Sequence, residues 1–192
     1  MYTNYFFFSV VTLLHCSCVA FFILNRSEKP FITIDSAGKF NLQIPPVVKN
    51  QKGNNFNTKG FTTVGFEQVY VTQLTDTAEI INAKLKEGLH IVFSPGIYNI
   101  DSPLIIEHSN TIVLGLGIAT LVASKQTKTI FQIGQVDGVR LCGLLLQAGA
   151  SKAVVPKSTL INWGSSDIPH SGSATNPGFL HDVFFRRFNL FL

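Results

Sequence analysis

The acidic side chains of the second half of the sequence are the first place to look for catalysis. They are Asp101, Glu107, Asp137, Asp167 and Asp182. Hydrolysis of a glycosidic bond requires two nearby carboxylates, one protonated and one ionised. Asp101 and Asp137 lie beside turn residues, where aspartate commonly bonds to the local backbone, and Glu107 ends an apolar run as a solvated residue. His181 and Asp182, which begin the last apolar run, remain as a weak candidate for a catalytic pair.

Two aromatic residues are candidates for binding a sugar. Trp163 and Tyr98 lie in the strand-rich half of the sequence, and an aromatic face suits the apolar face of a pyranose. The competing interpretation, which the pattern favours, is that both rings pack in the core or at a sheet edge. The Ser-, Gly- and Asn-rich stretch 164–178 is expected to be an inserted loop, and such loops shape the binding grooves of solenoid proteins.

No cofactor or metal is expected. Gly115 and Gly117 resemble part of a dinucleotide-binding pattern, but β-type residues follow them where that site needs a helix, so we interpret them as tight turns. There is no phosphate loop, no clear pair of metal-binding carboxylates and no calcium cluster of the kind a lyase needs. Lys and Arg do not cluster, so neither nucleotide nor nucleic acid is expected as a partner.

The composition indicates one folded domain, with or without a short leader. The chain has 192 residues, of which only 14% are charged, and its net charge is +4. Low charge and 46% hydrophobic residues exclude an intrinsically disordered chain and a charged coiled coil. If the leader is removed, Cys142 is the one cysteine that remains, so the cysteines do not indicate a redox compartment.

Residues 5–24 carry no charge, and twenty residues of helix rise about 30 Å, the thickness of a bilayer core. They are expected to form either a signal peptide, cleaved near Ala20, or a signal-anchor transmembrane helix that keeps the chain on the membrane. The protein is therefore expected to be secreted (extracellular) or membrane-anchored.

A helix is predicted over residues 76–87. Thr75 or Asp76 can serve as N-cap, with Glu79 completing a capping box. An apolar stripe formed by Ala78, Ile81 and Leu85, and widened by Ile80, follows along one face. Gly88 fits the left-handed position after the last turn.

Short apolar runs follow the helix, separated by Gly, Pro or Ser, and they recur in groups of three. First strands centre on Ile91, Ile112 and Val139, second strands on Tyr98, Leu121 and Leu145, and third strands on Ile105, Ile130 and Leu160. A repeat of about 20–30 residues with three short strands is typical of a solenoid. We therefore expect an all-β, right-handed parallel β-helix of about three coils, whose open end the helix caps. The alternative is an antiparallel sandwich. Against it, the one Asp-Gly pair, Asp137-Gly138, lies between runs assigned to different faces, and the other loops lack the usual Asn-Gly or Asp-Gly hairpin turn.

Several motifs resemble the pectate-lyase-like β-helix superfamily. They are the helix and Pro-Gly-x-Tyr turn over 76–98, followed in order by the segments 111–121, 136–144, 147–149 and 181–186. The group that they are most similar to contains the rhamnogalacturonase/epimerase-like pectate lyase domain, the fungal exo-β-1,3-glucanases and secreted microbial β-helix proteins, some of which carry an adenylyl cyclase label. The resemblance implies a carbohydrate-active, glucanase-like or lyase-like protein with a polysaccharide partner, and it covers roughly residues 30–186.

The sequence is thus divided into a leader at 1–24, an irregular or β segment at 25–75, the capping helix and first coils at 76–186, and an aberrant stub at 187–192. In 25–75 we expect a hairpin between residues 31–34 and 40–44. Because the family's chains continue through more coils, the resemblance implies an N-terminal fragment without a complete active site. The alternatives are a non-catalytic surface-binding or adhesion β-helix, and an inactive truncated product.

Overall fold

The structure is a computed structural model, and it describes residues 25–50, 59–124, 127, 129–149, 159–164, 170 and 172–186. The predicted leader at 1–24 and the predicted stub at 187–192 lie outside these ranges. Among the described residues, no helix has the length and apolar character needed to cross a membrane.

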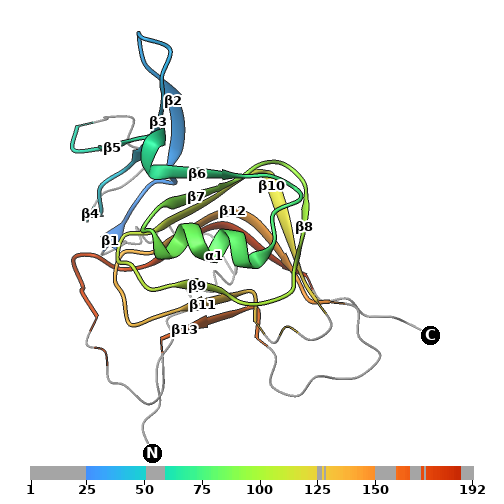
Figure 1. The fold of residues 1–192 in the computed structure, drawn as a ribbon. Helices are drawn as coiled ribbons and strands as arrows, with labels where there is room; N and C mark the ends of the chain where they lie inside the picture. Colours follow the sequence, from blue (N-terminus) through green and yellow to red (C-terminus); the bar gives the residue numbers. More distant parts are fainter. Residues whose placement is uncertain are drawn as a thin grey trace, which may run out of the picture.

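Parallel strands wind into three faces of a β-helix (Figure 1). The strands are β6 (Val69–Thr72), β7 (His90–Phe93), β8 (Ile97–Ile100), β9 (Leu104–Ile106), β10 (Ile112–Ala123), β11 (Phe131–Ile133), β12 (Arg140–Gln147), β13 (Ile161–Trp163) and β14 (Phe179–Arg186). One sheet has the order β14-β12-β10-β7-β6, with β8 paired to the second half of β10, and a separate sheet has the order β13-β11-β9. The all-β architecture with parallel coils is confirmed, and the antiparallel sandwich is excluded for this region.

The register of the coils differs slightly from the predicted one. Ile91 pairs with Val113 rather than Ile112, and Ile105 pairs with Gln132 rather than Ile130. Tyr98 and Leu121 are paired as predicted. The sequence period was therefore correct, but the turns between strands vary in length by one or two residues, and a strand repeat cannot reveal that variation.

The long strands β10, β12 and β14 each turn a corner between two faces. Where two separate runs were expected around Gly117, a single strand β10 continues through an irregularity between Leu114 and Ala119. Gly117 has φ +61°, and Gly143 on the next coil has φ +64°. Both backbones adopt the left-handed region, in which glycine carries no steric penalty. Gly117 therefore lies in a backbone turn as expected, whereas Gly115 does not have a positive φ and instead lies against the backbone of Gly143.

Inward side chains form one continuous apolar core. It includes Phe93, Leu121, Phe131 and Leu144, each fully buried, with the ring of Phe93 packed edge-on against that of Tyr98 at 4.9 Å between centroids. Burying side chains of this size contributes about 1.5–3 kcal/mol each, which holds the stacked coils together.

Helix α1 (Ala78–Lys86) covers the open end of the first coil, as predicted (Figure 1). It is shorter than expected, because Thr77 and not Asp76 is the N-cap: the Thr77 side chain accepts a hydrogen bond from the backbone N–H of Ile80. Asp76 instead accepts from the Tyr70 hydroxyl at 2.9 Å and from the backbone of Gln73 at 2.8 Å.

The buried face of α1 is narrower than the predicted stripe. Ala78, Ile81 and Leu85 are buried in the β-helix core, whereas Ile80 is 42% exposed and does not widen it. Gly88, with φ +83°, ends the helix as predicted.

In the described part of the chain, strand β9 has no neighbouring strand on the side where α1 lies, and the side chain of Asn82 in α1 hydrogen-bonds to the backbone there instead. The amide of Asn82 donates to the carbonyl of Pro103 at 2.9 Å and accepts from the backbone N–H of Ile105 at 2.8 Å. An amide side chain thus satisfies an edge that would otherwise be open to pairing with another chain.

A small antiparallel sheet precedes the β-helix and packs on its outside. It has the order β2-β3-β5 and contains the predicted hairpin of β2 (Phe31–Ile34) and β3 (Phe40–Ile44), joined by β5 (Thr62–Gly65). The remaining elements are the short strands β1 (Asn25–Arg26) and β4 (Val48–Lys49) and the 3₁₀ helix η1 (Phe66–Gln68). The β-helix sheet begins with β6, before the boundary expected at residue 76.

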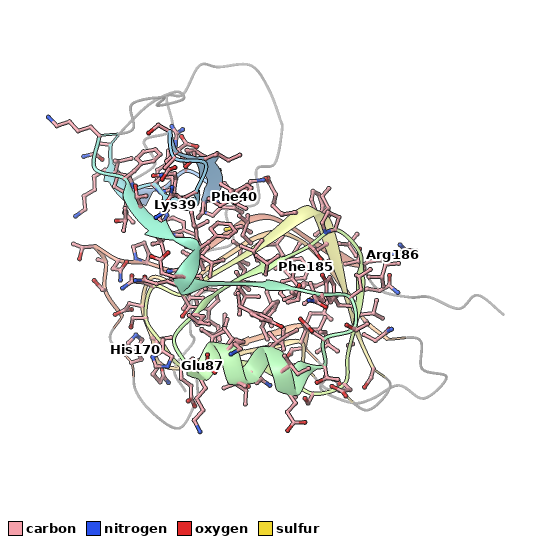
Figure 2. The ribbon with its side chains drawn as sticks, turned by 45° about the horizontal axis from the view of Figure 1, so that its top comes forward. Lys39, Phe40, Glu87, His170, Phe185 and Arg186 are labelled. Carbon is pink, nitrogen blue, oxygen red and sulfur yellow. The ribbon has the colours of Figure 1, made fainter. Side chains whose placement is uncertain are left out.

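The small sheet has an inner and an outer face. Leu42 and Val64 face the β-helix and pack on Val92, Ile112 and Leu114, which lie on the outside of the main sheet. Figure 2 shows the far end of the hairpin, at Lys39 and Phe40, on this small sheet and away from the end of α1 at Glu87.

Polar contacts fasten the N-terminal segment across the later coils. Lys29 bonds to Asp182 at 2.7 Å, and the guanidinium Nη1 of Arg140 donates to Ser27 Oγ and to the carbonyl of Pro45, both at 2.7 Å. Residues near the start of the described chain are therefore held by β12 and β14.

Candidate functional site

The predicted catalytic candidates lie at the corner of β14. Asp182 occupies the corner itself, with φ +51°, and its exposed carboxylate bonds to Lys29. That hydrogen bond and the lysine charge hold the pKa of Asp182 below its usual range. The carboxylate is therefore ionised at neutral pH and cannot serve as a general acid there.

His181 lies on the outside of the main sheet, beside Cys142 of the preceding coil. Its ring stacks on Phe179 at 5.3 Å between centroids, and its buried Nε2 has no hydrogen-bond partner among the described residues. Burial, followed by the charge of Arg140, lowers the pKa of His181. The imidazole is neutral, and a catalytic role for this pair stays a prediction.

The two predicted sugar-binding rings lie in or beside the core. Tyr98 is 1% exposed, and its hydroxyl accepts from Thr72 Oγ1 at 2.9 Å and lies 2.7 Å from Ser94 Oγ. The burial of Tyr98 agrees with the favoured interpretation that it packs in the core, and it rules out the weaker alternative that this ring stacks on a sugar. Trp163 is half-buried at the edge strand β13 and packs against the core, so its role in binding stays a prediction.

Asp137 lies in a turn and organises part of the predicted loop. It accepts from the backbone N–H of Ser173 at 3.0 Å and lies 3.1 Å from His170 Nε2. These two contacts lower the pKa of Asp137. Residues 165–169 and 171 of the loop are outside the described ranges, so its predicted part in substrate contact stays untested. Among the described residues, no group of three His, Cys, Asp or Glu side chains could hold a metal ion.

A pocket that the sequence did not predict lies between the small sheet and the outside of the β-helix. Its volume is about 470 Å³, and its polar walls come from both sides. The polar lining side chains are Thr62, His90, Asn110, Arg140, Thr175 and Asn176. The sequence did contain a signal for this pocket: Arg140 begins a strand that continues with six apolar residues, and a charge there needs a specific environment.

The outer face of the small sheet combines aromatic and uncharged polar side chains. Phe31 and Phe61 contact edge-on at 6.0 Å between centroids, and Phe31 is 40% exposed. Beside them, Thr63 donates to Gln43 Oε1 at 2.9 Å, and Gln43 donates to Thr33 Oγ1 at 3.2 Å. We refer to Phe31, Thr33, Gln43, Phe61 and Thr63 as the aromatic–amide face.

The chain has counterparts among known proteins. The chain is 38% identical over 161 residues to an exo-beta-1,3-glucanase of Streptomyces sp. (strain SirexAA-E / ActE), an alignment covering 83% of this chain and 26% of the relative. The chain thus spans about a quarter of that relative's length.

Two solved structures of a Streptomyces sp. SirexAA-E protein have the same fold. The structure of sacteLam55A gives a TM-score of 0.76 at 36% identity, over 85% of this chain and 29% of that one. A variant of sacteLam55A in complex with glucose gives 0.74 at 35% identity, over 84% and 28%. The model of the LAM55 pectate lyase-like domain matches residues 69–188, which begin at β6 and include every coil described above. The chain therefore belongs to the LAM55 pectate lyase-like family.

Proposed function

We propose that the chain is the N-terminal β-helix part of an extracellular or membrane-anchored protein of the exo-β-1,3-glucanase type, and that it binds β-1,3-glucan. The observation that carries this proposal is the 38% identity over 161 residues to an exo-beta-1,3-glucanase. The glucose-bound relative supports a neutral sugar as ligand. The uncharged run at 5–24 supports export, since a polymeric glucan is met outside the cell.

The described residues favour binding over cleavage. A glycosidase needs one carboxyl group whose pKa is raised, so that it holds a proton at working pH. Asp137 and Asp182 show the opposite, because hydrogen bonds hold the pKa of each below its usual range. We therefore propose that this chain contributes glucan contacts and that a complete pair of catalytic carboxylates requires further coils.

The aromatic–amide face suits a neutral glucan. A β-glucan offers flat patches of C–H groups that an aromatic ring can cover, together with hydroxyls that both donate and accept. Phe31 and Phe61 provide rings, and the Thr33–Gln43–Thr63 series provides hydroxyl and amide groups, with no charged side chain among them. Such a face costs little to desolvate compared with a charged one.

Affinity electrophoresis of the full chain in gels containing laminarin tests the binding. Retardation by laminarin, and not by hydroxyethyl cellulose, is expected. Glucose release from laminarin is measured in parallel with the same preparation and is expected to stay at the blank level. Equal migration in all gels would refute the binding proposal, and glucose release would show that this chain holds a complete catalytic pair.

Substitution of the two rings tests the location. The double variant Phe31→Ala with Phe61→Ala is expected to bind laminarin at least tenfold more weakly, equivalent to about 1.4 kcal/mol. Phe40→Ala is the matched control, because Phe40 is 51% exposed and contacts Phe66 rather than the Phe31–Phe61 pair. An equal loss in the control would place the glucan elsewhere.

A further inference from the structure

The pocket between the small sheet and the β-helix contains a buried cation, for which the described residues supply no anionic partner. Arg140 lines the pocket and is 6% exposed. Its Nη1 donates to Ser27 Oγ and to the carbonyl of Pro45, which are both neutral acceptors. A buried charge is costly unless it is paired. The guanidinium of Arg140 also lies 5.6 Å from the centre of the Phe179 ring, and this cation–π contact offsets part of that cost.

The nearby acids do not neutralise this arginine. Glu28 pairs with Arg26, and Asp182 pairs with Lys29. No Asp or Glu lines the pocket in the part of the chain that the structure describes. Burial consequently lowers the pKa of Arg140, although an arginine stays charged at any physiological pH.

A second donor stands in the same row of the sheet. The backbone N–H of Ile112 donates to Nδ1 of His90 at 3.2 Å, and burial lowers the pKa of this histidine. The neutral imidazole must then carry its proton on Nε2, which makes it a donor. His90 also lines the pocket. Ile112 lies between His90 and Arg140, and Ile112 is the residue that pairs with Arg140 on the neighbouring strand.

The spacing of these groups defines the size of a ligand. Two strand intervals separate His90 from Arg140, or roughly 9–10 Å between backbones. The apolar side chain of Ile112 forms the floor in that interval, and the amides of Asn110 and Asn176, which bond each other at 2.8 Å, line the same pocket. A volume of about 470 Å³ is within the usual range for small-ligand sites.

We propose that this pocket binds a sugar acid, a pyranose that carries a carboxylate. The carboxylate pairs with Arg140, the ring covers Ile112, and the hydroxyls meet His90 and the two asparagine amides. This site lies on the opposite side of the small sheet from the aromatic–amide face, so it is additional to the proposed glucan contact. It would let the protein recognise acidic sugar units that are attached to a neutral glucan or occur beside it.

Calorimetric titration of the full chain with D-glucuronate tests the proposal. D-glucose is the neutral comparison, and inorganic phosphate is the comparison for an anion without a sugar ring. Glucuronate is expected to bind at least tenfold more tightly than either. No binding of glucuronate, or equal binding of glucose, would refute a carboxylate site, and equal binding of phosphate would refute recognition of the sugar.

Two neighbouring substitutions locate the site without removing Arg140. Thr62 lines the pocket and is exposed at its rim, so Thr62→Asp supplies a competing carboxylate to the arginine while its bonds to Ser27 and Pro45 remain. Thr63→Asp adds the same charge on the opposite face of the same strand. Thr62→Asp is expected to weaken glucuronate binding at least tenfold, and Thr63→Asp to leave it unchanged. Loss in both variants, or in neither, would refute the assignment.

The same pair of variants separates this proposal from the glucan proposal. Thr63→Asp places a charge within the aromatic–amide face and is expected to weaken laminarin binding, whereas Thr62→Asp is expected to leave it intact. Failure of one ligand to bind therefore leaves the test of the other unaffected. Arg140→Lys completes the series: it keeps the charge but loses the planar fork, so a loss of glucuronate affinity is expected, and unchanged affinity would refute pairing of the carboxylate with the guanidinium.

Discussion

Removal of the Asn82 side chain should destabilise the first coil by a predictable amount. Asn82→Ala deletes the hydrogen bonds to the carbonyl of Pro103 and from the amide of Ile105. Each such bond contributes about 0.5–1.5 kcal/mol net, and the gain in helix propensity returns about 0.5 kcal/mol. The expected loss is therefore about 0.5–2.5 kcal/mol, or about 1–10 °C in melting temperature for a domain of this size.

Urea unfolding and hydrogen exchange of the Ile105 amide provide the assay. In Asn82→Ala this amide is expected to exchange faster than in the wild type. Asn82→Asp keeps an acceptor for it and should preserve its protection, while losing the donor to Pro103. Lys86→Ala, an exposed position of the same helix, controls for the change in propensity. If Asn82→Ala unfolds like the wild type and the Ile105 amide keeps its protection, Asn82 does not cap the edge of β9.

Three further outcomes follow from the described packing. Gly143→Ala should lower the free energy of unfolding, measured in urea, by about 2–4 kcal/mol. The reason is that Gly143 has φ +64° and that a Cβ there would lie 2.5 Å from the carbonyl oxygen of Gly115. A variant that unfolds like the wild type would contradict a strained corner at Gly143. Burial raises the pKa of Cys142 to about 12, so iodoacetamide at pH 8 should label its peptide only after unfolding, as mass mapping would show. Burial lowers the pKa of His181 in the folded chain, so the unfolded chain binds a proton at His181 at a higher pH than the folded chain does. The free energy of unfolding should therefore fall as the pH drops below about 6.5. His181→Phe should reduce this fall, and a variant with the pH profile of the wild type would refute the role of His181.

The sequence predicted the solenoid because strand repeats and caps are local signals. The stripe at Ala78, Ile81 and Leu85 and the glycine after the helix were sufficient to place a capping helix against the first coil. Inward-facing apolar positions such as Leu121, which recur in each coil, revealed the repeat of about 20–30 residues. The resemblance to β-helix proteins rested on these same residues.

The pocket could not be predicted in the same way, because its walls come from distant parts of the chain. Thr62 and Arg140 are brought together only when the small sheet packs on the outside of the coils. Tyr98 was considered for binding because its residue type is common in sugar sites, and only packing shows that its ring is inaccessible. The N-cap at Thr77 was missed because Asp76 is used by Tyr70 instead, a contact between two elements.

The bonds from Lys29 to Asp182 and from Ser27 to Arg140 have a consequence for the order of folding. A ribosome must add 153 residues after Lys29 before its partner exists. The early hairpin therefore emerges long before the surface on which it packs, and closure over such sequence separations is slow. Coils should form first, with docking of the N-terminal segment as a late step, and until then the apolar outer face around Ile112 is open to chaperones.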